Sequence, residues 1–184
     1  QRYGWTQFTS QGSFHSVCTV DTRVYAVVKF DKGDGTNKYI LCEFNTSFNT
    51  DMAKTYSGSN GVFNVSADFA NGAVLDVVSG THYLGQFTVA SGNIDVSAVD
   101  NSLSSAEIGF KFDVTLISNP IDTLSQTGPL TGEPRSMNKV ILDLSNTLSV
   151  SVNSNNLIIR QVTDDLSVAR QAVTGKKEFR LLGF

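Results

Sequence analysis

A chain of 184 residues, with 40% hydrophobic and 17% charged residues, is long enough to bury a core and fits one domain or two small ones. The low charge and the 15 glycines exclude helical bundles and coiled coils, which are rich in Ala, Glu, Lys and Leu. The net charge of -3 also excludes the basic surplus that is typical of proteins binding nucleic-acid phosphates.

Residues 1–45 predict a three-stranded antiparallel meander that resembles a propeller blade. Its strand patterns are separated by the short Asp21-Thr22 connector and by a loop rich in Gly and Asp. The hairpin of the second and third strands is apolar on both faces, whereas a surface hairpin usually has one polar face. We therefore expect another element to cover the second face. The three patterns span 13–20, 23–30 and 38–44.

Residues 46–105 predict a small acidic β module. From 46 to 110 the chain has one basic side chain, Lys54, against six acidic ones. Short strand patterns alternate with Gly turns and favour a small sandwich or barrel. We identify no internal repeat, and we expect a compact unit that can be excised, because charge and strand pattern differ from both flanks. The patterns span 62–69, 73–78, 81–90 and 93–99.

Residues 106–184 predict an antiparallel β domain that packs with the meander. Strict alternation over 107–116 predicts a half-buried strand with Phe110 and Phe112 inside. All three prolines lie in 118–136, which we expect to be a loop because Pro cannot donate to a strand ladder.

The end of the chain continues the strand pattern. Apolar residues of one parity from 140 to 152 form a run longer than usual strands, so we expect a bend near 145–147. Further strand patterns lie at 157–162 and 177–184. The fold class predicted for the whole chain is therefore all-β and mostly antiparallel.

The sequence shows no apolar run of membrane-span length and opens with no signal peptide. It begins at Gln1 and enters strand-like sequence almost at once, so we expect a piece of a longer protein. Cys18 and Cys42 both lie in predicted strands. Secreted disulfide domains usually have more cysteines, so we expect buried free thiols, with a bridge between neighbouring strands as the alternative.

We predict no catalytic, cofactor-binding or metal site. His15 and His82 have no Cys, His or carboxylate at metal-ligand spacing, and no G-x-S-x-G motif occurs. Trp5 and the tyrosines could form a sugar-stacking patch, but such a Trp is more often a core residue. The prediction is therefore a protein that is not an enzyme and needs no cofactor.

Two loops resemble binding motifs without completing them. DKGDGTNK carries Asp31, Asp34 and Asn37 but lacks the acidic residue that closes a calcium loop, so a hairpin turn is favoured. TGKK resembles the end of a phosphate loop, but Arg170 occupies the position of a required Gly. We expect TGKK to be a turn that leads into the final strand.

The first 45 residues carry an ordered series of short motifs. Trp5-Thr6-Gln7-Phe8 precedes Gly12, and three strand motifs follow. This series resembles the tail tubular protein B family, the nozzle or tail-stabilising proteins of short-tailed bacteriophages. The matching strand residues are Phe14, Ser16, Val17, Val20, Val24, Tyr25, Val27, Val28, Tyr39, Ile40 and Phe44.

The resemblance continues in the last third, whereas the acidic module matches only loosely. The stretches AEIGFKFDVTLISNPID, GEPRSMNKVILDLSNTLSVSV and VTGKKEFRLLGF follow in the order of the family. Leu148 and Ser149 depart from the family pattern, which has a glycine there. The residues that fit the second stretch are Arg135, Lys139, Val140, Leu142 and Leu144.

The resemblance implies a structural virion component in the phage tail, assembled in the host cytoplasm. Nozzle proteins of this family carry propeller-like sheets and form a hexameric ring around the DNA exit channel. Their partners are copies of themselves and other tail proteins, and DNA passes through without specific binding. Neighbouring blades cover both faces of a propeller sheet, which would explain the doubly apolar hairpin.

A second hypothesis needs no phage tail. Gly- and Asn-rich turns on a β scaffold are also common in carbohydrate- or surface-binding modules, such as adhesins or receptor-binding domains. Exposed aromatic side chains gathered at one loop end would favour this alternative, and a glycan array would distinguish the two hypotheses.

Overall fold

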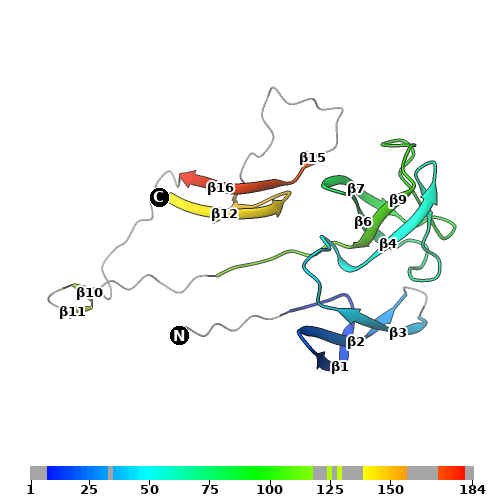
Figure 1. Cartoon of the computed structure of the whole chain (residues 1–184), viewed down its shortest axis with the longest axis horizontal. Coiled ribbons are helices and arrows are strands. Elements are labelled where there is room, and N and C mark those ends of the chain that lie inside the picture. Colours follow the sequence, from blue (N-terminus) through cyan, green and yellow to red (C-terminus); the bar gives the residue numbers. More distant parts are fainter. Residues whose placement is uncertain are drawn as a thin grey trace. The chain divides into compact units, whose positions relative to one another are not determined.

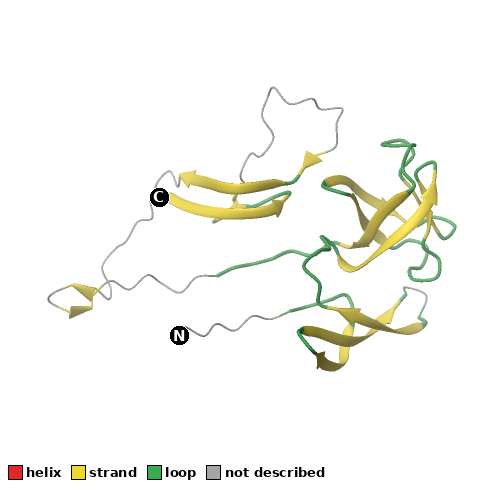
Figure 2. Cartoon of the chain, in the orientation of Figure 1, coloured by secondary structure: helices red, strands yellow, loops and turns green. Residues whose placement is uncertain are grey.

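The computed structural model describes residues 8–32, 35–117, 124–125, 128–129, 139–156 and 170–180. All regular elements in these ranges are β-strands, and the sheets are antiparallel as predicted (Figure 2). The chain divides into two compact units, residues 1–112 with 167–170 and residues 113–166 with 171–184.

The predicted meander is confirmed as one three-stranded sheet. Its strands β1 (Ser13–Val20), β2 (Arg23–Asp31) and β3 (Asn37–Glu43) are hydrogen-bonded in that order (Figure 1). Asp21 has a φ of 52°, which an Asp tolerates, so the tight turn joins β1 to β2. A bulge between Phe14 and Ser16 interrupts the register of β1.

The acidic region folds into a curled sheet, called the half-barrel below (Figure 1). The sheet order is β15-β7-β6-β9-β4-β5-β8, and the Ala90–Asn93 bridge joins the ends of β7 and β8 at the Ser91-Gly92 hairpin. The strands are β4 (Asp51–Ser59), β5 (Val62–Asn64), β6 (Val74–Ser79), β7 (His82–Thr88), β8 (Asn93–Asp95), β9 (Ser105–Phe110) and β15 (Arg170–Gln171).

The half-barrel consists of two copies of one repeat, contrary to our expectation that the sequence has none. A shift of 31 positions places β4, which starts at residue 51, on β7, which starts at residue 82. The same shift places β5 on β8 and β6 on β9. The segment GVFNVSA (61–67) then aligns with GNIDVSA (92–98).

Strand pairing shows that the two repeats are related by a pseudo-two-fold axis. Phe63 pairs with its counterpart Ile94, and Val77 pairs with its counterpart Ile108. The register of β4 with β9, 54–57 against 105–108, coincides after the shift with that of β7 with β6, 85–88 against 74–77. A residue that pairs with its own counterpart lies next to the axis, so the axis passes through both strand pairs.

Backbone hydrogen bonds repeat the same relation. Val65 N donates to Gly92 O at 2.9 Å, and Val96 N donates to Gly61 O at 2.8 Å. Each glycine follows a residue with positive φ in a tight turn, where φ is 73° at Gly61 and 75° at Gly92. Asn-Gly and Ser-Gly turns of this kind suit two-residue hairpins. Both repeats therefore have the same type of turn at the same position, and the glycine carbonyl of each turn accepts a hydrogen bond from the other repeat.

The core lies between the walls of the half-barrel and draws on both repeats. Apolar burial contributes about 1.5–3 kcal/mol for each large side chain that is removed from water. Phe30 of β2 joins this core, with its ring 5.5 Å from that of Phe110 and 6.2 Å from that of Phe69. The fully buried large side chains are Val28, Phe63, Val65, Leu75, Val77, Val89, Ile94, Val96 and Ile108.

The half-barrel extends beyond the module that we predicted for 46–105. β9 begins at Ser105 and lies between β4 and β6 in the sheet, so it is a central strand. A fragment ending at residue 105 would lack this strand and would also lose Phe30 from its core. Residues 46–105 therefore do not enclose a complete sheet.

The strand predicted for 107–116 is correct only as far as Phe110. β9 ends there, Phe110 is half-buried, and Phe112 is 48% exposed, so its predicted burial is wrong. The physical reason is the length of the partner strand. Phe110 pairs with Asp51, the first residue of β4, so the alternation continues in the sequence while the ladder ends.

The second unit contains β12 (Lys139–Thr147) paired with β16 (Val173–Arg180). Their register breaks between Leu144 and Thr147, and Asn146 has a φ of 47°, which confirms the predicted bend. Leu144 and Phe179 are buried. The short strands of this unit are β10 (Leu124–Ser125) with β11 (Gly128–Pro129) and β13 (Ser151–Val152) with β14 (Asn155–Asn156).

Several expectations lie outside the described residues. These are the role of Trp5, the strand at 157–162, the part of 177–184 beyond Arg180, and most of the proline-rich segment. Within that segment Pro129 ends β11, in a two-residue pairing rather than a long ladder. The packing of residues 106–184 with the meander stays a prediction.

Phe63 and Ile94, called the axial pair below, lie next to the pseudo-two-fold axis, and exchanging the two side chains tests the repeat. Ile94→Phe alone should overpack the core by about 1–3 kcal/mol, and Phe63→Ile alone should leave a cavity, because both side chains are fully buried. The double variant keeps the core volume. We expect it to cost less than the sum of the single variants, with a coupling free energy of about 0.5–3 kcal/mol in urea unfolding.

A pair with the same chemistry but in different units is the control. Phe179→Ile combined with Ile94→Phe should be additive, because Phe179 belongs to the second unit. If the free-energy costs of the Phe63 and Ile94 variants were also additive, the two side chains would not share one position in the core.

Candidate functional site

The two histidines lie in different sheets of the described structure. His15 lies at the bulge of β1 with its ring 5.6 Å from that of Tyr39, and His82 begins β7 opposite Ser79. Within the described ranges no group of three His, Cys, Asp or Glu side chains could hold a metal ion. Our prediction of no catalytic or metal site stays a prediction.

The structure confirms the interpretation of the DKGDGTNK loop and contradicts that of TGKK. Asp31 ends β2 and pairs with Asn37 at the start of β3, and its Oδ1 accepts a hydrogen bond from Gly35 N at 3.2 Å. These residues close a hairpin as interpreted, whereas Asp34 lies outside the described residues. Gly175 lies inside β16 opposite Leu144, so TGKK is part of the strand and the predicted turn is wrong.

Both cysteines are free thiols, but only one is partly buried. Cys18 is exposed, which corrects our expectation that both are buried. Burial, together with the charge of Asp51, raises the pKa of the Cys42 thiol. Cys18 pairs with Tyr25 and Cys42 with Ala26, so the thiols lie on opposite faces of the meander and cannot bridge within one sheet.

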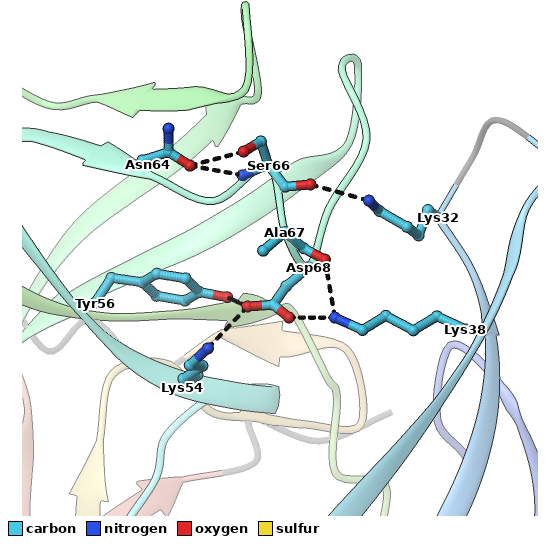
Figure 3. Close-up of polar contacts among 8 residues, drawn as sticks. All are labelled: Lys32, Lys38, Lys54, Tyr56, Asn64, Ser66, Ala67 and Asp68. Carbon is cyan, nitrogen blue, oxygen red and sulfur yellow. Dashed lines mark hydrogen bonds and ion pairs between the residues drawn. The ribbon is translucent and has the colours of Figure 1, made fainter.

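The strongest polar feature is a cluster around one carboxylate, called the Asp68 cluster below (Figure 3). Asp68 follows β5 in a single turn, where Val65 O accepts hydrogen bonds from Asp68 N and Phe69 N. This turn directs the carboxylate toward three donors that come from two other strands. Asp68 accepts hydrogen bonds from Lys38 Nζ at 2.5 Å, Tyr56 Oη at 2.7 Å and Lys54 Nζ at 3.0 Å.

The donors of the cluster come from neighbouring elements. Lys54 and Tyr56 are two residues apart on β4 and share one side of that strand, and the Lys54 ammonium lies 5.2 Å from the centre of the Tyr56 ring. Lys38 comes from β3 and also donates to Ala67 O at 2.8 Å. Lys32 adds a bond to Ser66 O at 2.9 Å, so the meander hairpin is fastened to the half-barrel turn.

Electrostatics at Asp68 favour the ionised form. Burial alone would raise the pKa of this carboxyl, but the hydrogen bonds from Lys38, Tyr56 and Lys54 outweigh burial and lower the pKa to about 2. Burial and the Asp68 carboxylate raise the pKa of Tyr56 far above its ordinary value. At neutral pH Asp68 is therefore charged and Tyr56 neutral, so the pair holds the two sheets together and is a poor acid–base pair.

An open hollow of about 450 Å³ lies beside this fastening. Among its lining residues only Lys32 is charged, and its ammonium already donates to Ser66 O. The hollow therefore offers no pair of titratable groups for acid–base chemistry. The other lining residues are Ser66, Phe69, Ala70, Asn71, Ser91 and Gly92.

The meander exposes one apolar face. Its inner face carries the buried Ala26, Val28 and Phe30. Its outer face carries Leu41, 68% exposed, Tyr39, 58% exposed, and Val20, 54% exposed. The His15 ring lies against Tyr39, but all three side chains stay largely exposed, so this face is the best candidate for a contact with another molecule.

Comparisons with protein-family models, with curated proteins and with solved structures found no match. No helix in the described ranges has the length and apolar character needed to cross a membrane.

No sequence pattern pointed to the Asp68 cluster. Lys38, Lys54 and Asp68 are separated by intervals that match neither a strand period nor a known motif. The surplus of acidic residues in this region was visible in the sequence. The pairing of one of them with two lysines from different strands follows only from the fold.

Replacement of the central carboxylate tests the fastening. Asp68→Asn should lower the free energy of unfolding by about 1–3 kcal/mol, because it weakens hydrogen bonds to a charged group. Because the pKa of Asp68 lies below its ordinary value of 3.8, its stabilisation is present above that pH and is lost as the pH falls toward 2. Urea unfolding between pH 6 and pH 2 should show this acid loss in the wild type and much less of it in the variant.

The matched control is Asp95→Asn. Asp95 is the counterpart of Asn64 in the other repeat, and both side chains accept a hydrogen bond from the backbone two residues later. We expect this variant to keep the stability of the wild type at neutral pH. Equal losses of unfolding free energy in Asp68→Asn and Asp95→Asn would contradict a special role for the Asp68 cluster.

Proposed function

We propose that this chain is a structural component of a phage tail nozzle, where it contributes to the wall of the DNA exit conduit. The observation that supports the proposal is the position of the family-like motifs. The three motifs of the first 45 residues coincide with β1, β2 and β3, three neighbouring strands of one sheet. Motifs that belong to one ancestral module are expected to fold together in this way.

The chemistry of the described residues is compatible with a passive role. The cluster with the most strongly perturbed pKa values holds two sheets together and does not line a deep cavity. We therefore propose that the chain acts without catalysis and without a cofactor. Its partners would be other tail proteins and copies of itself, and its place would be the virion tail.

Weak net negative charge also supports a conduit. A basic wall would hold the phosphate backbone, whereas DNA has to leave without being retained. The 14 basic residues are outnumbered by 17 acidic ones. In the described part of the second unit Glu178 lies 3.0 Å from Arg180 and 3.8 Å from Lys139, so the cations nearest to a basic patch are partly neutralised.

A carbohydrate- or surface-binding module is the second candidate. Tyr39 and Leu41 on the open face of the meander would be its contact residues, because aromatic rings stack on sugars. A clear hit on a glycan array that disappears in Tyr39→Ala would favour this alternative over the nozzle.

Labelling of virions tests the nozzle proposal directly. Antibodies raised against this chain, applied with colloidal gold to particles of the phage that encodes it, should mark the tail in electron micrographs. Antibodies absorbed with the purified chain are the control and should leave the tail unmarked. Gold confined to the capsid, or no gold on particles, would contradict the proposal.

A gel-shift experiment tests the conduit argument. The chain at micromolar concentration should leave duplex DNA unshifted at moderate salt, because few phosphates can be neutralised by a surface with an acidic surplus. A tight complex that weakens steeply with added salt would contradict a wall that lets DNA pass.

A further inference from the structure

We propose that β1 is a docking edge for a second copy of this chain, with two β1 strands paired antiparallel about a two-fold axis. The inference goes beyond the proposed function and does not depend on it, since it rests on the exposure and charge of one strand. It would extend the three-stranded meander into a continuous sheet across two molecules.

The first observation is the exposure of β1 on both faces. All eight of its residues are exposed, including Val17 at 60% and the apolar side chains of Phe14 and Val20. Among the described strands only β2 pairs with β1, so the outer edge of β1 presents its backbone groups without a described partner strand. Such an edge is a template for an added strand.

The second observation is that β1 carries neither a charged residue nor proline, although a bulge interrupts it between Phe14 and Ser16. Natural edge strands usually carry charges or proline that prevent pairing with other chains. The other edge of the meander, β3, carries Lys38 and Glu43. β1 has the sequence SFHSVCTV, with no Lys, Arg, Asp, Glu or Pro. The contrast between the two edges of one sheet indicates that β1 is kept open for pairing.

The charge of β1 also selects the partner. A strand without formal charge meets a second copy of itself without like-charge repulsion, whereas an acidic or basic strand would find no opposite charge along β1. Arg23, which pairs with the end of β1 at Val20, already forms an ion pair with Glu43 at 3.3 Å. Contacts between identical patches closed by a two-fold axis are the commonest form of self-association.

The bulge of β1 defines which residues would pair. It lies between Phe14 and Ser16, so the regular part of the strand is 16–20. An antiparallel pair centred on this segment brings Cys18 opposite Cys18 of the second copy. Directly opposite residues have Cβ atoms about 4.5–5.5 Å apart, within reach of a short bifunctional thiol reagent.

Two exposed valines of one unit provide the test. Val17→Lys places a cation on the proposed edge, and Val99→Lys places one on the half-barrel, where Val99 is 51% exposed. Sedimentation velocity of the full chain, from micromolar to submillimolar concentration, should show a monomer–dimer equilibrium in the wild type. We expect Val17→Lys to raise the dimer dissociation constant about tenfold or more and Val99→Lys to leave it unchanged.

Cross-linking of the wild type provides a second readout, which does not depend on the lysine variants. A short bismaleimide should join two chains through Cys18, and Cys18→Ser should abolish the product. A wild type that stays monomeric over this range, equal effects of the two lysine variants, or dimers without a Cys18 cross-link would each overturn the proposal. These outcomes leave the nozzle proposal standing, because gold labelling of the tail does not depend on β1.

Discussion

The exchange of strands between the two repeats is the constraint on which the first unit depends. β6, the last strand of the first repeat, pairs with β7 and β9, which both belong to the second repeat. β9, the last strand of the second repeat, pairs with β4 and β6 of the first. Neither repeat can satisfy the backbone of its own last strand, so the half-barrel forms as a whole.

Departures from the symmetry lie where the meander is attached. The counterparts of Lys54, Tyr56 and Asp68 are Gly85, Phe87 and Val99, none of which can form the same polar cluster. The first repeat therefore carries an ion-pair fastening that the second lacks. Phe30 inserts its ring beside Phe69, whose counterpart is Asp100, so the apolar part of the attachment is also confined to one repeat.

Much of the fold could be predicted from the sequence, because period-two alternation is a local signal. The three meander strands and the bend in β12 followed from it. β4 was missed because DMAKTYSGS mixes polar and apolar residues and a positive φ at Met52 breaks its alternation. The repeat was missed because the aligned copies are identical only at the positions of Gly61, Val65, Ser66 and Ala67. The prediction that Phe112 is buried was wrong because it depends on the length of the partner strand, which is not a local property of the sequence.

Strand exchange also has a consequence for the order in which the chain folds during synthesis. The β6–β7 hairpin joins the two repeats through a turn with Gly80 at a φ of 60°, and its strands are adjacent in sequence, so it can form as soon as it leaves the ribosome. The pairing of Asp51 with Phe110 closes a long loop and has to wait until β9 has emerged. Until then the edge of β6 that pairs with β9 is exposed to solvent. Pulsed hydrogen exchange during refolding should accordingly protect the β6–β7 hairpin before β4, and the nascent chain is most in need of a chaperone in the interval between them.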